Sequence, residues 1–154
     1  MKTPVPMKAK ILKFIEEHEG ATFADLHTHL QNFQGIQMMC LPWNQQVAVW
    51  AGMSVEATDA VNELLKSATV LLSVVTPFEY DRAGATLDLP LAYDSEAEYK
   101  ELRWLPVKLL NRRQYAKVQS DYEETIAKLE EARALYAQDD NLPKPTHAPP
   151  ATVQ

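Results

Sequence analysis

The sequence predicts a mixed α+β domain that is followed by a long C-terminal helix. Residues 55–67 place their apolar side chains on one helical face, and they lead directly into residues 69–76, a β-branched apolar run typical of a buried strand. Further along, residues 111–138 repeat large side chains every seven positions, which is typical of a long helix. The chain has 154 residues, enough for one domain with an appended helix.

Two short helices are expected near the N-terminal end. Residues 7–18 carry an apolar stripe, and Gly20 can take the left-handed conformation that ends a helix. Thr22 is a good N-cap residue with Asp25 three positions later, and this capping-box-like pair predicts a second helix over residues 23–31. The stripe of the first helix consists of Met7, Ile11, Leu12, Phe14 and Ile15.

The segment that follows carries weaker signals. Residues 32–46 contain Gly35 and Pro42 and have no clear period, so we interpret them as a loop. Residues 46–50 are interpreted as a short strand, which Gly52 closes. Helix 55–67 then begins at a Ser N-cap and has an apolar face made of Ala57, Ala60, Val61, Leu64, Leu65 and Ala68.

A β-hairpin is expected after this helix. Residues 69–76 form its first strand, which Pro77 ends, and residues 86–91 alternate with period two as a second strand would. Residues 81–84 (Asp-Arg-Ala-Gly) supply turn chemistry, so the hairpin tip is expected to run from Phe78 to Ala85. Residues 95–102 are then expected to form one or two helical turns, which the sequence Leu-Pro-Val at 105–107 breaks.

The order of helix 7–18, helix 23–31, helix 55–67 and a hairpin resembles a winged helix-turn-helix domain over about residues 7–92. This resemblance implies that the third helix enters the major groove of DNA and that the wing touches the phosphate backbone or the minor groove. The matching residues are Glu56, Asp59, Asn62, Glu63 and Lys66 on the open face of the third helix, and Arg82 at the hairpin tip. We therefore expect a winged-helix-like domain over 1–92, a connector over 93–110, the long helix over 111–138 and a disordered tail over 139–154.

Basic side chains are concentrated at the start of the long helix. Six of them fall within 18 residues that contain one acid, Glu101, and two interleaved aromatic residues, Trp104 and Tyr115. Such a stretch suits phosphate contact with stacking, although charge runs also commonly just solvate the start of a helix. The six are Lys100, Arg103, Lys108, Arg112, Arg113 and Lys117, and Lys8, Lys10 and Lys13 add a second cluster.

The long helix is expected to form a homodimer. Twenty-eight residues of helix reach about 42 Å, whereas a single domain is little wider than about 30 Å, so part of the apolar stripe needs cover from elsewhere. A second copy is the simplest source of that cover, and the alternative is that the helix folds back on its own hairpin. The stripe consists of Tyr115, Val118, Tyr122, Ile126, Leu129 and Tyr136.

Residue patterns for catalysis or metal binding are weak. The segment Asp-Leu-His-Thr-His at 25–29 resembles a metal-binding strand of amidohydrolase-like enzymes, but on a helix His27 and His29 point about 200° apart. Cys40 is the single cysteine, so there is no disulfide framework or multi-cysteine metal cluster, and glycine-rich phosphate loops are missing. We expect no metal, no cofactor and no enzymatic activity.

Two functions from different classes remain open. The first is a dimeric DNA-binding protein, a transcriptional or accessory regulator that contacts DNA mainly through its basic clusters. The alternative is an acidic protein-interaction module, an adaptor or inhibitor on the same fold. It is favoured by the net charge of −6 and by three carboxylates on the open face of helix 55–67, which would repel phosphates. With no targeting segment and no apolar run long enough for a membrane span, we expect a cytoplasmic protein.

Overall fold

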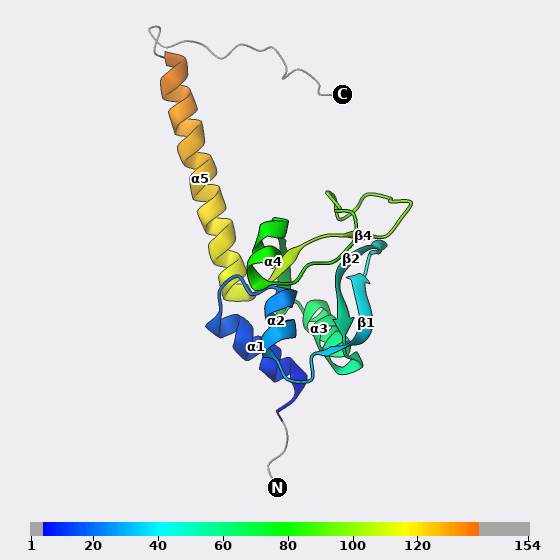
Figure 1. Cartoon of the computed structure of the whole chain (residues 1–154). Helices are drawn as coiled ribbons and strands as arrows, with labels where there is room; N and C mark the ends of the chain where they lie inside the picture. The colour runs from blue at the N-terminus through cyan, green and yellow to red at the C-terminus, as the bar shows by residue number, and fades with distance from the viewer. Residues whose placement is uncertain (1–4, 139–154) are drawn as a thin grey trace. The chain divides into compact units, whose positions relative to one another are not determined.

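The computed structural model describes residues 5–138, and it has the mixed α+β layout that the sequence predicts (Figure 1). The chain divides into two units, Met1–Tyr115 and Ala116–Gln154. The first unit holds all the strands and the shorter helices, and the second holds most of the long helix. The predicted disordered tail at 139–154 lies outside the described residues.

The two N-terminal helices form as predicted. Helix α1 spans Met7–Glu17 and buries one stripe of its surface, and helix α2 spans Phe23–His29. A complete capping box begins α2: the backbone N–H of Asp25 donates to Thr22 Oγ1 at 3.2 Å, and the backbone N–H of Thr22 donates to Asp25 Oδ2 at 2.9 Å. This reciprocal pair fixes where α2 starts.

The prediction of a loop over residues 32–46 is wrong. This segment forms strand β1 (Gln34–Leu41), which pairs with strand β2 (Asn44–Met53) as an antiparallel hairpin. The first five side chains of β1 are all exposed, and the register shifts several times along the pair, so no alternating pattern marks the strand in the sequence. The predicted short strand at 46–50 is the middle of the longer β2.

Helix α3 (Val55–Lys66) forms as predicted and begins where Ser54 Oγ accepts the backbone N–H of Ala57 at 3.0 Å. Its end is closed by Ala68, which has a left-handed φ of 54°. The N–H groups of Ala68 and Thr69 donate back to the carbonyls of Leu65 and Leu64, which satisfies the last turn of the helix. This tight ending directs the chain into strand β3 (Val70–Val74).

The predicted hairpin between residues 69–76 and 86–91 is wrong. Pro77 begins helix α4 (Pro77–Ala83), because proline is well suited to the first position of a helix, and Gly84 ends that helix with a φ of 86°. Residues 86–91 form no strand, and Leu91 contributes only an isolated bridge to Trp104. The turn chemistry at 81–84 therefore marks the end of a helix.

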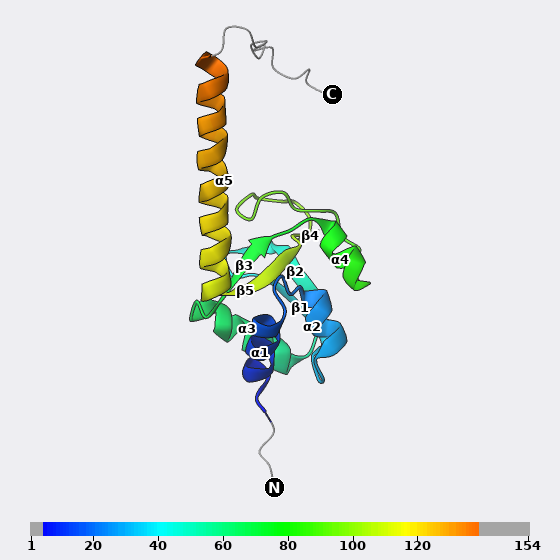
Figure 2. The same ribbon diagram turned by 90° about the vertical axis from the view of Figure 1, so that its left-hand side faces the viewer.

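Strand β3 finds its partner much later in the chain. Strand β5 (Val107–Asn111) pairs with it in a regular antiparallel register, and strand β4 (Arg103–Trp104) pairs in parallel with β2 (Figure 2). The predicted boundary at residue 92 is therefore wrong, because the expected connector supplies a strand to each sheet. The helical turns predicted for residues 95–102 are also not formed.

Tyr80 of α4 lies at the centre of the core and is completely buried. Its ring centroid is 5.3 Å from that of Trp50 and 5.0 Å from that of Trp104. The hydroxyl of Tyr80 donates to the carbonyl of Val107 and accepts the N–H of Phe23. Burial raises the pKa of Tyr80 above its ordinary range. This side chain joins α2, β2, β4 and β5.

The long helix α5 spans Arg112–Gln138, close to the predicted 111–138. Asn111 and Gln114 form a second reciprocal cap: Gln114 N–H donates to Asn111 Oδ1 at 2.8 Å, and Asn111 N–H donates to Gln114 Oε1 at 3.0 Å. The buried amide of Gln114 also donates to the carbonyl of Ile15 at 2.7 Å. Among residues 5–138, no helix combines the length and apolar character that crossing a membrane requires.

Candidate functional site

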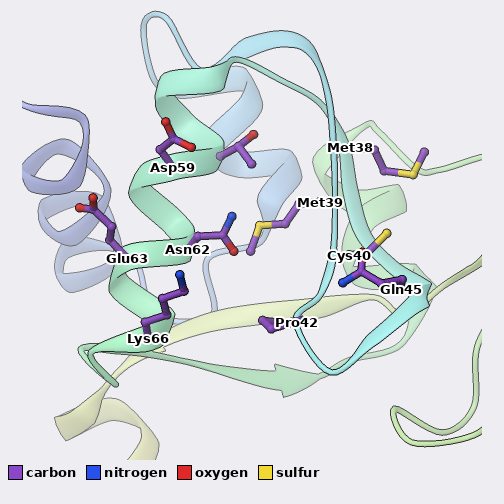
Figure 3. A pocket seen from close by; sticks show the side chains of 10 residues that line it. Met38, Met39, Cys40, Pro42, Gln45, Asp59, Asn62, Glu63 and Lys66 are labelled. Atoms are coloured by element: carbon purple, nitrogen blue, oxygen red, sulfur yellow. The ribbon is translucent and has the colours of Figure 1, made fainter.

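A groove of about 490 Å³ runs between helix α3 and the β1–β2 hairpin (Figure 3). One wall is the outward face of α3, and the other is the second half of β1 with the turn that follows it. The lining residues are Thr58, Asp59, Asn62, Glu63 and Lys66 on α3, and Met38, Met39, Cys40, Pro42 and Gln45 on the hairpin.

The periodicity of α3 explains why polar side chains line the groove. Its apolar residues at 57, 60, 61 and 64 are buried against the rest of the unit, so the positions between them face outward. The outward residues are separated by three or four positions and therefore share one face of the helix. Asn62 and Met39 point toward one another across the groove in Figure 3.

The hairpin wall consists of two methionines and a cysteine, together with Pro42 and Gln45. Met39 is buried, whereas Met38 is 44% exposed. Cys40 is half-buried, and the loss of solvent raises the pKa of its thiol, so the neutral form is favoured. Flexible methionine side chains can adapt to the shape of an incoming group.

The charges of the groove are mostly acidic. Asp59 and Glu63 contribute two carboxylates and Lys66 one ammonium group. Glu63 also forms an ion pair with Lys8 of α1, in which Lys8 Nζ lies 2.9 Å from Glu63 Oε2. The hydrogen bond from Lys8 and its positive charge lower the pKa of Glu63. Both partners are well exposed, so this pair orients the two side chains more than it stabilises the fold.

A second, apolar pocket of about 380 Å³ adjoins the groove and shares Pro42 and Lys66 with it. Its other lining residues are Trp43, Leu65, Val70, Leu71 and Leu72. The indole of Trp43 is 62% exposed, and its N–H donates to the carbonyl of Ser95 at 3.2 Å. This bond holds a large apolar ring at the surface in a defined position.

The residues predicted for nucleic-acid binding come from several elements of the chain. Asn62 and Lys66 line the groove beside two carboxylates. Arg82 lies in the last turn of α4, so its predicted place at a hairpin tip is wrong. Lys108 lies on β5, and Arg113 and Lys117 are exposed on α5.

Two of the predicted arginines donate to backbone carbonyls. Arg103 donates to the carbonyl of Leu91 at 3.0 Å and to Glu101 at 3.3 Å, and its guanidinium lies 4.8 Å from the ring centroid of Tyr99. The Nε of Arg112 donates to the carbonyl of Ala68 at 2.8 Å. These contacts give both side chains a structural role.

The residues predicted for a dimer interface lie along α5, the first of them in the first unit and the others in the second. Val118, Tyr122 and Leu129 are exposed, whereas Tyr115, Ile126 and Tyr136 are half-buried. Their spacing places them on one face of the helix, as the sequence predicts.

The two histidines of the metal-like segment are part of α2. His27 contacts the edge of Trp50 at a centroid distance of 6.0 Å, and His29 stacks on Phe14 at 5.7 Å. Within residues 5–138, there is no cluster of three or more His, Cys, Asp or Glu residues arranged to hold a metal ion.

The chain matches no protein-family model, no curated protein and no solved structure.

The hairpin wall of the groove is the part that sequence reasoning missed. The sequence predicts a loop over residues 32–46, so the predicted fold contains no surface opposite the polar face of α3. Pro42 and Trp43 are the signal that could have indicated strand β1. They form a two-residue turn before residues 44–53, and a short turn before one strand of a hairpin implies a second strand on its other side.

Proposed function

We propose that this protein is a non-enzymatic interaction module that binds a segment of another protein in the α3–β1 groove. The observation that carries the proposal is the composition of the groove walls. Carboxylates and an amide from α3 face methionine side chains from β1 across a space of about 490 Å³. Such walls suit a partner side chain that has an apolar stem and a basic or amide end.

Charge favours a protein partner over DNA at this surface. A DNA backbone placed along α3 would meet the carboxylates of Asp59 and Glu63, and because Glu63 is paired with Lys8, the repulsion of phosphates would come mainly from Asp59. Arg103 and the Nε of Arg112 donate to backbone carbonyls of the fold, whereas Arg113 and Lys117 are exposed on α5 and are not among the residues that line the groove. A basic or amide side chain, in contrast, would donate hydrogen bonds to the same carboxylates.

The test begins with the full chain immobilised for affinity capture, followed by identification and purification of the captured protein. Calorimetry then compares the wild type with Asn62→Trp, which fills the groove without changing its charge. We expect at least about a tenfold loss of affinity, because a filled groove excludes the partner side chain. The matched control is Glu56→Trp, which introduces the same ring on α3 outside the groove and should bind as the wild type does.

Two outcomes would contradict the proposal. Equal affinities for the wild type and Asn62→Trp would place the partner elsewhere on the molecule. The second outcome concerns the DNA-binding prediction. Fluorescence anisotropy measures the binding of a labelled DNA duplex to the protein at low salt. Tight DNA binding by the wild type would contradict the proposal if the double variant Arg112→Ala, Arg113→Ala had two effects. It would weaken DNA binding, and it would reduce the slope of log affinity against log salt concentration by about two units, as expected for phosphate contact.

A further inference from the structure

One face of helix α5 alternates larger and smaller side chains. Successive positions on this face are four or three residues apart, which is the spacing of a coiled-coil seam. The larger side chains are Tyr115, Tyr122 and Leu129, and the smaller ones are Val118, Thr125 and Ala132. Tyr122 is 67% exposed and Leu129 is 60% exposed, and the three smaller residues are exposed as well. This face is therefore accessible to a partner.

The alternation of size favours a second, antiparallel copy of α5 as that partner. In a parallel pair each position faces its own counterpart, so Tyr122 meets Tyr122 while Ala132 meets Ala132. Layers of this kind are alternately crowded and empty, and both defects destabilise a packed contact. In an antiparallel pair every larger residue faces a smaller one, because the order of the two helices is reversed. The facing pairs are then Tyr115 with Ala132, Tyr122 with Thr125, and Leu129 with Val118.

Charged residues beside the seam select the register. Asp121 and Lys128 each lie one position before a larger seam residue, on the same flank of the seam. With Tyr122 opposite Thr125, Asp121 of each copy lies beside Lys128 of the other, and the twofold symmetry makes this contact twice. A shift of seven residues in one direction sets Asp121 against Asp121, and in the other direction Lys128 against Lys128. Opposite charges at such flanking positions favour one pairing, and like charges disfavour the others.

The remaining charges of α5 oppose a parallel pair. Residues 112–120 include three basic residues and no acid, whereas residues 121–138 include five acids and two basic residues. In a parallel pair the basic block would lie along its own copy, where like charges repel. In the antiparallel register, Lys117 is instead level with Glu130 of the second copy. Lys128 keeps its exposed ion pair with Glu124 of its own helix, at 3.0 Å, and gains Asp121 from the other helix.

We propose that this protein forms a homodimer through α5, with the two helices antiparallel and Tyr122 of each copy opposite Thr125 of the other. The contact spans residues 115–132, which is about 27 Å of helix. A contact of this size is small for a stable dimer, so the two copies should separate in the micromolar range. The proposal does not depend on the α3–β1 groove or on the partner of that groove.

The experiment measures the mass of the full chain by light scattering from low micromolar to near millimolar concentration. The wild type should pass from one to two copies over this range. Asp121→Lys and Lys128→Glu should each weaken the dimer by at least about tenfold, because each variant sets like charges side by side twice. An equimolar mixture of the two variants should dimerise as the wild type does, since the mixed pair again contains two contacts between opposite charges.

The matched control is Glu123→Lys, which makes the same change of charge as Asp121→Lys at an exposed position of α5 away from the seam, and it should dimerise nearly as the wild type does. Circular dichroism of all the variants at low concentration should equal that of the wild type. A wild type that remains a monomer near millimolar concentration would overturn the proposal. So would a dimer that neither charge variant weakens, or a mixture of the two variants that stays monomeric, because neither result is compatible with Asp121 beside Lys128.

Discussion

The β1–β2 hairpin and the β3–β5 pair are held together in different ways. The hairpin joins neighbouring segments through a short turn, and its register shifts repeatedly along its length. The β3–β5 pair joins distant segments in a regular register. Side chains of other elements donate hydrogen bonds to it: Tyr80 to the carbonyl of Val107 on β5, and Arg112 to the carbonyl of Ala68 just before β3. The hairpin therefore depends on close backbone fit, as at Gly35, whereas the β3–β5 pair depends on hydrogen bonds between residues that lie far apart in the chain.

The largest expected effect is on the hairpin. Gly35 packs so closely that an added Cβ would lie 2.5 Å from Ser54 Cα and 2.6 Å from the carbonyl oxygen of Met53. Both contacts are with backbone, which cannot rotate away, so Gly35→Ala should lower the free energy of unfolding by about 3 kcal/mol. Urea denaturation measures this loss. Ile36→Ala, which changes the neighbouring and almost fully exposed residue, should leave the midpoint unchanged.

The next effect is on the β3–β5 pair. Tyr80→Phe keeps the aromatic packing but removes the hydroxyl that binds Val107 and Phe23, and an unsatisfied buried group costs about 1–3 kcal/mol. The same change should alter the response to alkali. Because burial raises the pKa of Tyr80, its stabilisation is complete below the unfolded-state pKa and is lost as the pH rises above about 10. Denaturant titrations at neutral and alkaline pH should show a smaller alkaline loss in Tyr80→Phe, while Tyr93→Phe at the surface should behave as the wild type does.

A smaller, stabilising effect is expected where α3 turns into β3. Ala68 adopts a left-handed φ of 54°, a conformation that costs a residue with a Cβ about 1–2 kcal/mol. Ala68→Gly should remove that strain and raise the thermal midpoint, with a net gain of about 1 kcal/mol after the added flexibility of the unfolded chain. In contrast, Ala60→Gly in the middle of the same helix should lower the midpoint. A fall in both variants would mean that the turn is not strained.

The smallest effect concerns the thiol on the hairpin wall of the groove. Burial raises the pKa of Cys40, so at neutral pH the reactive thiolate is scarcer than in a free cysteine. We expect a thiol-specific reagent to modify the folded chain more slowly than a model thiol. Because Cys40 is the only cysteine, unfolding the protein in urea provides the control and should restore the full rate. A folded rate as fast as the unfolded rate would show that the hairpin opens readily.

Local signals predicted helices α1, α2, α3 and α5 and strand β3 correctly, whereas α4 was missed. The Thr22–Asp25 capping box, the Ser54 cap and the apolar face of α3 each involve residues only three or four positions apart. They can therefore be recognised in the sequence without knowledge of the rest of the fold. The heptad spacing of the long helix is equally local. The face of α3 that lines the groove could therefore be predicted, with Asn62 and Lys66 among its residues.

Strand pairing could not be predicted in the same way. Residues 86–91 alternate as a strand does and lie close to β3 in sequence, yet β3 pairs with residues 107–111. The hydroxyl of Tyr80 donates to Val107 and Arg112 donates to Ala68 at this pair, and neither long-range contact leaves a pattern in the sequence. The β1–β2 hairpin could not be predicted for a different reason. The first half of β1 is exposed on both faces, so its sequence lacks the alternation of apolar and polar residues that marks a strand.

The late position of β5 in the chain has a consequence for synthesis on the ribosome. Strand β3 emerges well before β5, because α4 and the whole of residues 84–102 are made in between. During that interval the apolar strand Val70–Val74 lacks the partner strand that β5 provides in the folded chain. A chain truncated before Val107 would therefore present an uncovered apolar strand edge, which favours aggregation.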